Sequence, residues 1–408
     1  MQINNVNRKL LLTIMVSALG YFVDVYDIIL FAVLRVPSLK ALGLSPEEIT
    51  SVGLDLLNFQ LVGMLLGGVV WGMLGDKRGR LSILFGSIIL YSLANFANAF
   101  VTDVTQYAVL RFLAGFGLAG EFGAGITIVS ELMSTQKRGI GTTIITAAGV
   151  LGGITGGLVG NLFTWKTAYM IGGGAGFVLL LLRLSLVEST LYLSVKQQKN
   201  IAKGSLFAFI KNPQLLKRYI QCLFIGIPFW VFIGIYMTLA PEIGRLLNVQ
   251  GVITTGFAIL FFNIGLGLGE FSSGLYSQWC GSRKKAVFIF QAICFGVLVT
   301  FLSLNDITPA LFYFFCSLLG FGVGNWAVFM VMSTEQFGTN LRATVTVSLP
   351  NMVRGMGVPL TLLITALKPT LGLLMILGLI GGASLILAMI SLVFLPETFS
   401  RKLDFVET

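Results

Sequence analysis

The sequence contains no histidine, few cysteines and few charged residues. Of its 408 residues four are cysteine and only 11% are charged, against about a quarter in a soluble domain. The absence of histidine excludes His-based catalysis, His metal centres and the usual proton relay group. The shortage of charge excludes an ordinary cytosolic enzyme, a disordered chain and a DNA-binding module. Proton chemistry in this chain must therefore depend on carboxylates.

The cysteines give no sign of a metal or redox site. Cys222, Cys280, Cys294 and Cys316 lie in or beside apolar runs without metal-type spacing, which is typical of buried thiols. No Walker-type loop is present, so ATP is not expected to drive the protein. We expect no catalytic residue, no metal and no cofactor.

Long apolar runs dominate the sequence. Hydrophobic residues make up 56% of the chain and the mean hydropathy is +0.91. Runs of about 20 residues are long enough to cross about 30 Å of hydrocarbon. The sequence predicts an all-α polytopic membrane protein with 12 transmembrane helices. The predicted spans are 9–34, 50–74, 82–101, 105–130, 141–162, 167–187, 219–241, 253–279, 286–304, 309–333, 343–367 and 370–395.

The basic residues predict an orientation. Placing both termini inside puts 19 of the 27 Lys and Arg residues on the cytoplasmic side, as the positive-inside rule requires. We expect a multi-pass protein of the bacterial inner (cytoplasmic) membrane with both termini cytoplasmic. The first span follows Arg8-Lys9 without a small-residue cleavage site, so we expect it to be retained. Arg183, near the inner edge of its span, is expected to snorkel.

The two halves of the sequence repeat. Glu131 is followed seven residues later by Arg138, and Glu335 is followed by Arg342 at the same spacing after the tenth span. Duplicated halves are typical of transporters, whose substrate site lies where the halves meet near mid-membrane. The predicted parts are an N-terminal six-helix bundle at 1–187, a cytoplasmic linker at 188–218 and a C-terminal six-helix bundle at 219–408.

Two motifs carry a family resemblance. The segment Gly72-Met-Leu-Gly-Asp-Lys-Arg-Gly-Arg80 lies between spans two and three and resembles the loop signature of the major facilitator superfamily. Arg111-Phe-Leu-Ala-Gly115 resembles the fourth-span Arg-x-x-x-Gly element of that family. The resemblance implies a secondary transporter with a cytoplasmic gating network. The residues expected in this network are Gly75, Asp76, Arg80, Glu131, Arg138, Glu335 and Arg342.

Spans one and four resemble one branch of the family. The segment Asp24-Val-Tyr-Asp27 and the pair Gly120-Glu121 are similar to motifs of metabolite:proton symporters and of aromatic-acid and organic-ion porters. The chain departs from this branch at Met64-Leu65, where the symporters usually have Arg-Pro.

Three acids are candidates for proton coupling. Asp24 and Asp27 share one helix face by their i, i+3 spacing, and an acid near mid-bilayer is expensive unless it is paired or wet. We expect Asp27, with Asp24 and Glu121, to couple transport to protons. The alternative is a structural pairing of Asp24 or Asp27 with Arg111 or Arg354.

Arg354 is the expected main anion-binding residue. It lies about 18 Å into the eleventh span, counted from Arg342, and a guanidinium can clamp a carboxylate through two parallel hydrogen bonds. We expect Gly355 and Gly357 to leave room beside it. The alternative is a permanent ion pair with Asp27, Glu121 or Glu270. Further expected substrate contacts are Arg111, Tyr21, Asn58, Gln60, Trp230, Tyr236, Asn263, Asn325, Trp326 and Asn351.

The sequence thus predicts a secondary active transporter that moves a small organic anion with protons by alternating access. The alternative is a proton-driven exporter of drugs or of an endogenous metabolite such as a siderophore. Family exporters commonly carry Gly-Pro on the fifth span, and no proline occurs between Gly141 and Thr164. A membrane enzyme or a channel is disfavoured. The expected partners are the substrate, H+ and the bilayer, with no nucleic acid, and the expected state is a monomer.

Overall fold

The computed structural model of the chain describes residues 2–133, 138–184, 212–401 and 405–407. In these ranges every regular element is a helix, and 12 helical segments are long and apolar enough to cross a membrane. The predicted all-α polytopic fold class is therefore confirmed. Most of the predicted linker, 188–218, lies outside the described residues.

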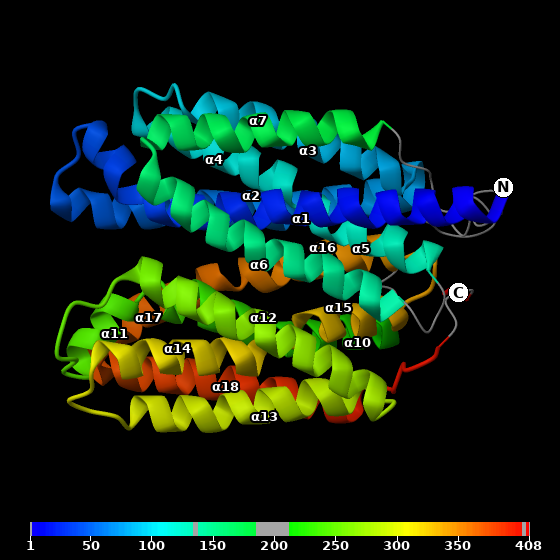
Figure 1. Cartoon of the computed structure of the whole chain (residues 1–408). Helices are drawn as coiled ribbons and strands as arrows, with labels where there is room; N and C mark the ends of the chain where they lie inside the picture. The colour runs from blue at the N-terminus through cyan, green and yellow to red at the C-terminus, as the bar shows by residue number, and fades with distance from the viewer. Residues whose placement is uncertain (1, 134–137, 185–211, 402–404, 408) are drawn as a thin grey trace. The chain divides into compact units, whose positions relative to one another are not determined.

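The helices have the following bounds (Figure 1). They are α1 (Gln2–Ala41), α2 (Pro46–Arg78), α3 (Arg80–Asn98), α4 (Val104–Leu118), α5 (Glu121–Leu132), α6 (Arg138–Leu162), α7 (Trp165–Arg183), α10 (Pro213–Trp230), the π-helix η1 (Val231–Tyr236), α11 (Ala240–Leu246), α12 (Thr255–Trp279), α13 (Arg283–Leu302), α14 (Pro309–Val323), α15 (Trp326–Glu335), α16 (Arg342–Gly355), α17 (Gly357–Leu371) and α18 (Leu373–Phe394).

Local sequence explains where several helices begin and end. Ser45 and Glu48 form a capping box at the start of α2, with the Ser45 N–H donating to Glu48 Oε2 at 2.9 Å. Gly79 separates α2 from α3 at φ 111°, and Gly372 separates α17 from α18 at φ 75°. Glycine adopts such positive φ values at little cost. Both chain reversals are therefore encoded by single residues.

Two membrane spans are broken at equivalent places in the two halves. Between α4 and α5 the helix is interrupted at Ala119 and Gly120, and between α14 and α15 at Gly324 and Asn325. Backbone groups freed inside a span must find protein partners or face a cavity. Broken spans are typical of transporter binding regions. The structure thus adds an internal similarity that the loop motifs alone did not contain.

The described chain forms two compact units. Unit 1 comprises Met1–Leu215, Ser333–Gly355 and Ser400–Thr408, and unit 2 comprises Leu216–Met332 and Met356–Phe399. Helix α16 of the second half thus groups with the first half of the chain. The domain boundaries expected from the sequence stay a prediction.

In unit 1, glycines allow helices to approach closely. Helix α1 packs along α6, α2 along α4 and α16, and α3 along α7. A Cβ atom on Gly152 would lie 2.1 Å from the Phe22 carbonyl oxygen, and one on Gly156 would lie 2.6 Å from that of Tyr26. Small residues of this kind are the usual means of bringing membrane helices together.

Unit 2 uses the same device. Helix α12 packs on α14, and α13 packs on α14 and α18. A Cβ atom on Gly265 would lie 1.8 Å from the Ser317 carbonyl oxygen, and one on Gly320 would lie 2.1 Å from that of Phe262. The α12–α14 contact therefore depends on these two glycines.

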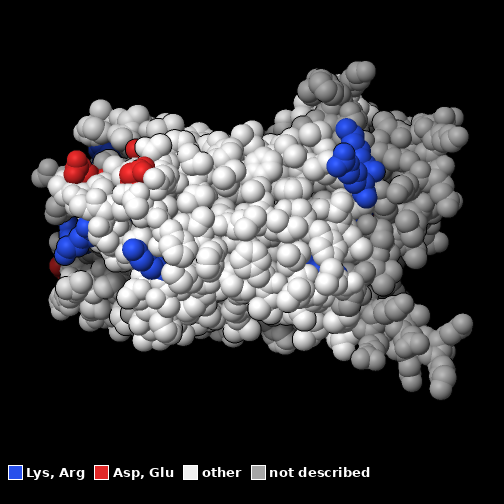
Figure 2. All heavy atoms as spheres, turned by 90° about the horizontal axis from the view of Figure 1, so that it is seen from above, with Lys and Arg blue, Asp and Glu red and all other residues white. Residues whose placement is uncertain are grey.

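Large apolar side chains cover the outer faces of both units. Leu151 and Leu158 on α6 are 59% and 55% exposed, and Phe271 on α12 is 62% exposed. On the face seen in Figure 2, charged side chains gather toward the two ends of the helices. This distribution suits a surface that faces lipid.

Candidate substrate and proton site

Asp27 lies in a dense set of hydrogen-bond donors inside unit 1. Its Oδ1 accepts from Asn95 Nδ2 at 2.6 Å, and its Oδ2 accepts from Gln60 Nε2 at 3.1 Å and from Arg111 Nη2 at 2.8 Å. Asp27, Asn95 and Arg111 are fully buried. Gln60, expected as a substrate contact, is thus a partner of Asp27, whereas the nearby Asn58 is partly buried.

Aromatic rings surround the guanidinium of Arg111. Its Cζ lies 5.0 Å from the ring centre of Phe31 and 5.5 Å from that of Tyr169. The Tyr169 hydroxyl accepts from Arg111 Nη1 at 3.3 Å and lies 2.5 Å from the Tyr107 hydroxyl. Because Arg111 is fully buried, it does not snorkel. The Asp27–Arg111 pair is therefore closed by protein on all described sides.

Asp24 forms a second buried pair, with Arg354 of α16. Arg354 Nη2 donates to Asp24 Oδ2 at 3.1 Å, and the two residues are 5% and 0% exposed. The other carboxylate oxygen, Asp24 Oδ1, has no hydrogen-bond partner among the described residues. The alternative in which Arg354 pairs with Asp27, Glu121 or Glu270 is therefore wrong, whereas the alternative of a pairing of Asp24 or Asp27 with Arg111 or Arg354 agrees with both ion pairs. Instead the i, i+3 acids of α1 bind two different arginines.

Tyr21 lies beside this second pair. It interacts with Arg354, and its ring stacks on Phe122 of α5 with centroids 3.9 Å apart. Gly149 of α6 makes room for the ring, since a Cβ atom there would lie 2.3 Å from Tyr21 Cε1. The structure thus brings an expected aromatic contact next to the expected anion-binding residue.

Asn351 stands one turn from Arg354 on α16, as expected. Its Nδ2 donates to the Val347 carbonyl at 2.7 Å and to the Ala119 carbonyl at 2.8 Å. The second bond satisfies a backbone oxygen at the break between α4 and α5. Its Oδ1 is buried without a partner in the described part of the chain.

The glycines that follow Arg354 do not leave empty space. A Cβ atom on Gly355 would lie 2.5 Å from Leu65 Cδ1, and one on Gly357 would lie 2.4 Å from Trp230 Nε1. The expectation of free room beside Arg354 is therefore wrong. Gly355 and Gly357 instead allow Leu65 and Trp230 to pack closely against the backbone.

Glu121 forms a third buried pair, with Arg183. Both guanidinium ends of Arg183 donate to Glu121, and Ser87 Oγ donates to Glu121 Oε1 at 2.5 Å. Arg183 also donates to the Leu84 carbonyl. At 1% exposure Arg183 does not snorkel, so that expectation is wrong. A Cβ atom on Gly20 would lie 2.8 Å from Arg183 Nη2, and this glycine provides the space for the inward turn.

Asp76 of the signature loop caps a helix. It accepts from the backbone N–H groups of Ala343 and Thr344, at 3.2 and 2.8 Å, and from the Thr344 hydroxyl at 2.7 Å. These groups open α16, where the helix dipole favours an anion. Arg80 lies 3.4 Å from Asp76 and donates to the Gly75 carbonyl at 3.1 Å.

Glu131 joins two arginines of the expected gating network. Its Oε1 lies 2.9 Å from Arg80 Nη2 and 3.3 Å from Arg342 Nη1, and all three side chains are buried. Arg342 therefore pairs with the glutamate of the other repeat. Glu335 is also buried, whereas the side chain of Arg138 lies outside what the structure describes. The gating role of this set stays a prediction.

Two expected contact residues of unit 2 are bonded to backbone. The Tyr236 hydroxyl donates to the Leu377 carbonyl at 2.6 Å. Asn263 Nδ2 donates to the Ile259 carbonyl of its own helix at 2.8 Å. Both side chains are buried.

The other expected residues of unit 2 lie in aromatic surroundings. Trp326 stacks on Phe229 with ring centroids 4.3 Å apart. Asn325 donates to the Gly322 carbonyl at 3.1 Å at the break between α14 and α15. Trp230 is 8% exposed. Substrate contact by any of the expected residues stays a prediction.

Sequence reasoning missed Asn95 and Tyr169 and misplaced Arg183. Asn95 donates to Asp27, and Tyr169 stacks beside Arg111 and accepts from it. Asn95 and Tyr169 are polar side chains inside apolar spans, and this feature of the sequence could have identified them as candidates. Their partners are between 58 and 68 residues away, so no local spacing could identify them.

The comparisons with known proteins decide the family. Residues 10–361 match the Major Facilitator Superfamily. The chain belongs to this superfamily. The resemblance of the loop and fourth-span motifs is thus confirmed, and the protein is an integral, multi-pass membrane transporter and not an enzyme.

Relatives of known name cover most of the chain. The niacin transporter NiaP of Acinetobacter baylyi is 24% identical, over 80% of this chain and 80% of its own. The benzoate transport protein of the same organism is 22% identical, over 81% of this chain and 78% of its own. The proton:xylose symporter XylE has a TM-score of 0.75 at 16% identity and covers 98% of both chains. This last likeness shows the fold.

Proposed function

We propose that the protein carries a small organic anion together with a proton across the bacterial cytoplasmic membrane by alternating access. The observation that carries this proposal is the buried Asp24–Arg354 pair, whose carboxylate has one oxygen without a partner in the described chain. Arginine is suited to binding a carboxylate through two parallel hydrogen bonds. Relatives that transport niacin and benzoate, both aromatic carboxylates, support an aromatic acid as the solute.

In this proposal Asp24 exchanges with the solute. A proton on Asp24 removes its charge and weakens its bond to Arg354, which then binds the carboxylate of the solute. The empty site contains one negative and one positive side chain, and the loaded site contains a neutral acid, a guanidinium and the anion. Net charge is therefore equal in both states. Loss of the proton on the other side restores the ion pair and expels the anion.

Asp27 and Glu121 keep their arginine partners in this proposal. Asp27 accepts three hydrogen bonds from side chains, and Glu121 accepts from Arg183 and Ser87. A coupling role for Asp27 or Glu121 stays a prediction, and transport by Asp24→Asn and Asp27→Asn distinguishes Asp24 from Asp27.

The aromatic neighbours of Arg354 support an aromatic solute. Tyr21 and Phe122 are stacked, and Tyr21 interacts with Arg354. A ring attached to a carboxylate could stack here while the carboxylate binds the guanidinium, because offset ring stacking adds roughly 0.5–1.5 kcal/mol.

Matched acids and amides test the proposal. The purified protein is reconstituted in proteoliposomes, and uptake of benzoate and nicotinate is compared with that of benzamide and nicotinamide, with and without an inward proton gradient. We expect gradient-driven accumulation of at least one acid and none of its amide. Equal transport of acid and amide would contradict anion recognition. Accumulation only with the opposite gradient would identify a proton-driven exporter.

A natural cysteine tests the predicted orientation. Cys280 is partly exposed, whereas Cys222, Cys294 and Cys316 are buried. Cys280 follows α12, at a turn that we propose to be cytoplasmic. A membrane-impermeant maleimide should label wild-type protein in inside-out vesicles and not in intact cells, and Cys280→Ser should abolish this labelling. Labelling of Cys280 from outside the cell would show that the orientation is the opposite of the one proposed.

A further inference from the structure

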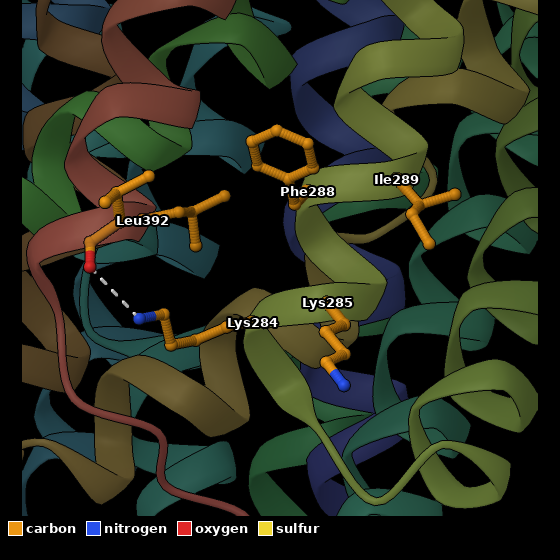
Figure 3. A pocket seen from close by; sticks show the side chains of 6 residues that line it. Lys284, Lys285, Phe288, Ile289 and Leu392 are labelled. Carbon is orange, nitrogen blue, oxygen red and sulfur yellow. Dashed lines mark hydrogen bonds between the residues drawn. The ribbon is translucent and has the colours of Figure 1, made fainter.

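A small hollow lies in unit 2 between the first turns of α13 and the last turn of α18. Its volume is about 450 Å³, within the range of sites that bind small molecules. The residues that line it are Lys284, Lys285, Phe288, Ile289, Leu392 and Val393 (Figure 3).

The hollow lies where two membrane spans meet water. The span of α13 begins at Arg283, and that of α18 ends at Phe394. Trp279, which ends α12 just before this turn, is 83% exposed, as is common for tryptophan at a membrane interface. A ligand in the hollow would therefore have one end among head groups and the other in hydrocarbon.

The wall on the hydrocarbon side is apolar and open. Phe288 is 41% exposed, Ile289 is 37% exposed and Val393 is 65% exposed. Such side chains favour a hydrocarbon chain as their neighbour, since burial of apolar surface is favourable by roughly 25 cal/mol per Å².

Two lysines stand at the other end of the hollow. The ammonium of Lys284 points toward α18 and donates to the carbonyl oxygens of Leu395 at 2.5 Å and Val393 at 3.3 Å, as the dashed line in Figure 3 shows for one of these bonds. The next residue, Lys285, is exposed and extends away from α18 (Figure 3). One cation is thus fixed at the mouth of the hollow, and a second is free to adjust.

The neighbouring charges are engaged elsewhere. Glu397 accepts from the Ser282 hydroxyl and from the backbone N–H groups of Arg283 and Lys284. The guanidinium of Arg283 lies over Phe399 at 4.9 Å and donates to Ser277. Three cations, Arg283, Lys284 and Lys285, thus lie near one carboxylate, Glu397, and the net charge at the mouth is positive.

We propose that this hollow binds an anionic phospholipid, with the phosphate on Lys284 and Lys285 and an acyl chain along Phe288, Ile289 and Val393. Basic pockets between membrane helices recognise lipid head groups in this way. The site is independent of the transport function proposed above.

Native mass spectrometry of the purified full chain tests the site. The protein is titrated with phosphatidylglycerol and, separately, with phosphatidylcholine of the same acyl chains. We expect phosphatidylglycerol to bind more tightly and Lys285→Gln to weaken it about fivefold, the typical contribution of one basic residue near a membrane surface. Lys285→Arg should bind normally. Lys368→Gln, which removes an exposed lysine from α17 of the same unit, is the matched control and should leave binding unchanged.

Three results would overturn the proposal. One is equal binding of the two lipids, and another is an equal loss in Lys285→Gln and Lys368→Gln. The third is competition by glycerol 1-phosphate at the concentration of the lipid, which would show an anion site without a role for the acyl chain. Phe288→Ser tests the contact between the acyl chain and the apolar wall. This variant should weaken lipid binding without changing the circular dichroism spectrum.

Discussion

The two carboxylates of α1 are one helical turn apart but have different surroundings. Asp27 accepts three hydrogen bonds from Asn95, Gln60 and Arg111. Asp24 accepts one, from Arg354, and its second oxygen has no partner in the described chain. Both are fully buried, so burial does not distinguish them. The difference lies in how many donors stabilise the charge.

This difference assigns different roles to the two pairs. We propose that Asp27 and Arg111 form a fixed cross-link among α1, α2, α3 and α4, because three side-chain donors from α2, α3 and α4 hold the Asp27 carboxylate in place. Asp24 and Arg354 hold each other with few other bonds, so a proton and an anion can replace their mutual contact.

The largest expected loss of stability comes from breaking the Asp27–Arg111 pair. Arg111→Gln leaves Asp27 buried without its cation, and removal of one partner of a buried pair costs roughly 3–5 kcal/mol. Arg354→Gln should cost clearly less, because Asp24, which in the proposed mechanism takes up a proton, can become neutral and leave no unpaired charge buried. Thermal unfolding of both variants in the same detergent measures the difference. Equal losses of Tm would remove the distinction between the pairs.

An intermediate effect is expected for Arg354→Lys. Lysine keeps the charge but cannot form two parallel bonds to a carboxylate. Binding of the transported acid should weaken by about 1–3 kcal/mol, while the Tm changes little. Equilibrium binding of radiolabelled benzoate or nicotinate measures it. Affinity equal to that of the wild type would mean that Arg354 supplies charge alone.

The smallest expected change in stability concerns Glu397, a carboxylate outside the membrane spans that accepts several hydrogen bonds. Partial burial alone would raise its pKa, but the hydrogen bonds from Ser282 and from backbone N–H groups, including that of Arg283, lower it below the ordinary value. Its stabilising contribution is therefore complete above the ordinary glutamate pKa of about 4.3 and is lost as the pH falls through the lowered pKa.

Glu397→Gln tests this reasoning at an accessible group. It should lower stability at pH 7 by about 1 kcal/mol, the typical value for a lost helix cap. The Tm difference from wild type should shrink at pH 3. A difference that stays constant over this range would mean that hydrogen bonds to the ionised form do not control the behaviour of this carboxylate.

Much of the fold followed from local sequence. Apolar runs and their breaks predicted all twelve spans, because span length is fixed by the thickness of the hydrocarbon. The signature loop predicted that Asp76 and Arg80 act together, and they lie 3.4 Å apart as an i, i+4 pair. Short sequence separation made that contact predictable.

The sequence named Asp24, Asp27, Arg111 and Arg354 as candidates for pairing, but it could not assign each arginine to its acid. Asp24 and Arg354 are 330 residues apart, and Asp27 and Arg111 are 84 apart. Which arginine meets which acid depends on how tertiary packing places α1 relative to α4 and α16, and helical periodicity does not contain this information. Arg183 turned inward because Gly20 left space beside Glu121, a contact between residues far apart in the sequence.

The central claim is that Asp24 exchanges the coupled proton while Asp27 keeps its bond to Arg111. Asp24→Asn and Asp27→Asn are reconstituted in proteoliposomes, and uptake of the acid that the wild type accumulates is measured with and without an inward proton gradient, beside exchange of labelled for unlabelled acid. We predict that Asp24→Asn loses gradient-driven accumulation but still exchanges, and that Asp27→Asn, where it folds, keeps its response to the gradient. Full proton-driven accumulation by Asp24→Asn, with its loss in a folded Asp27→Asn, would contradict the account and assign coupling to Asp27.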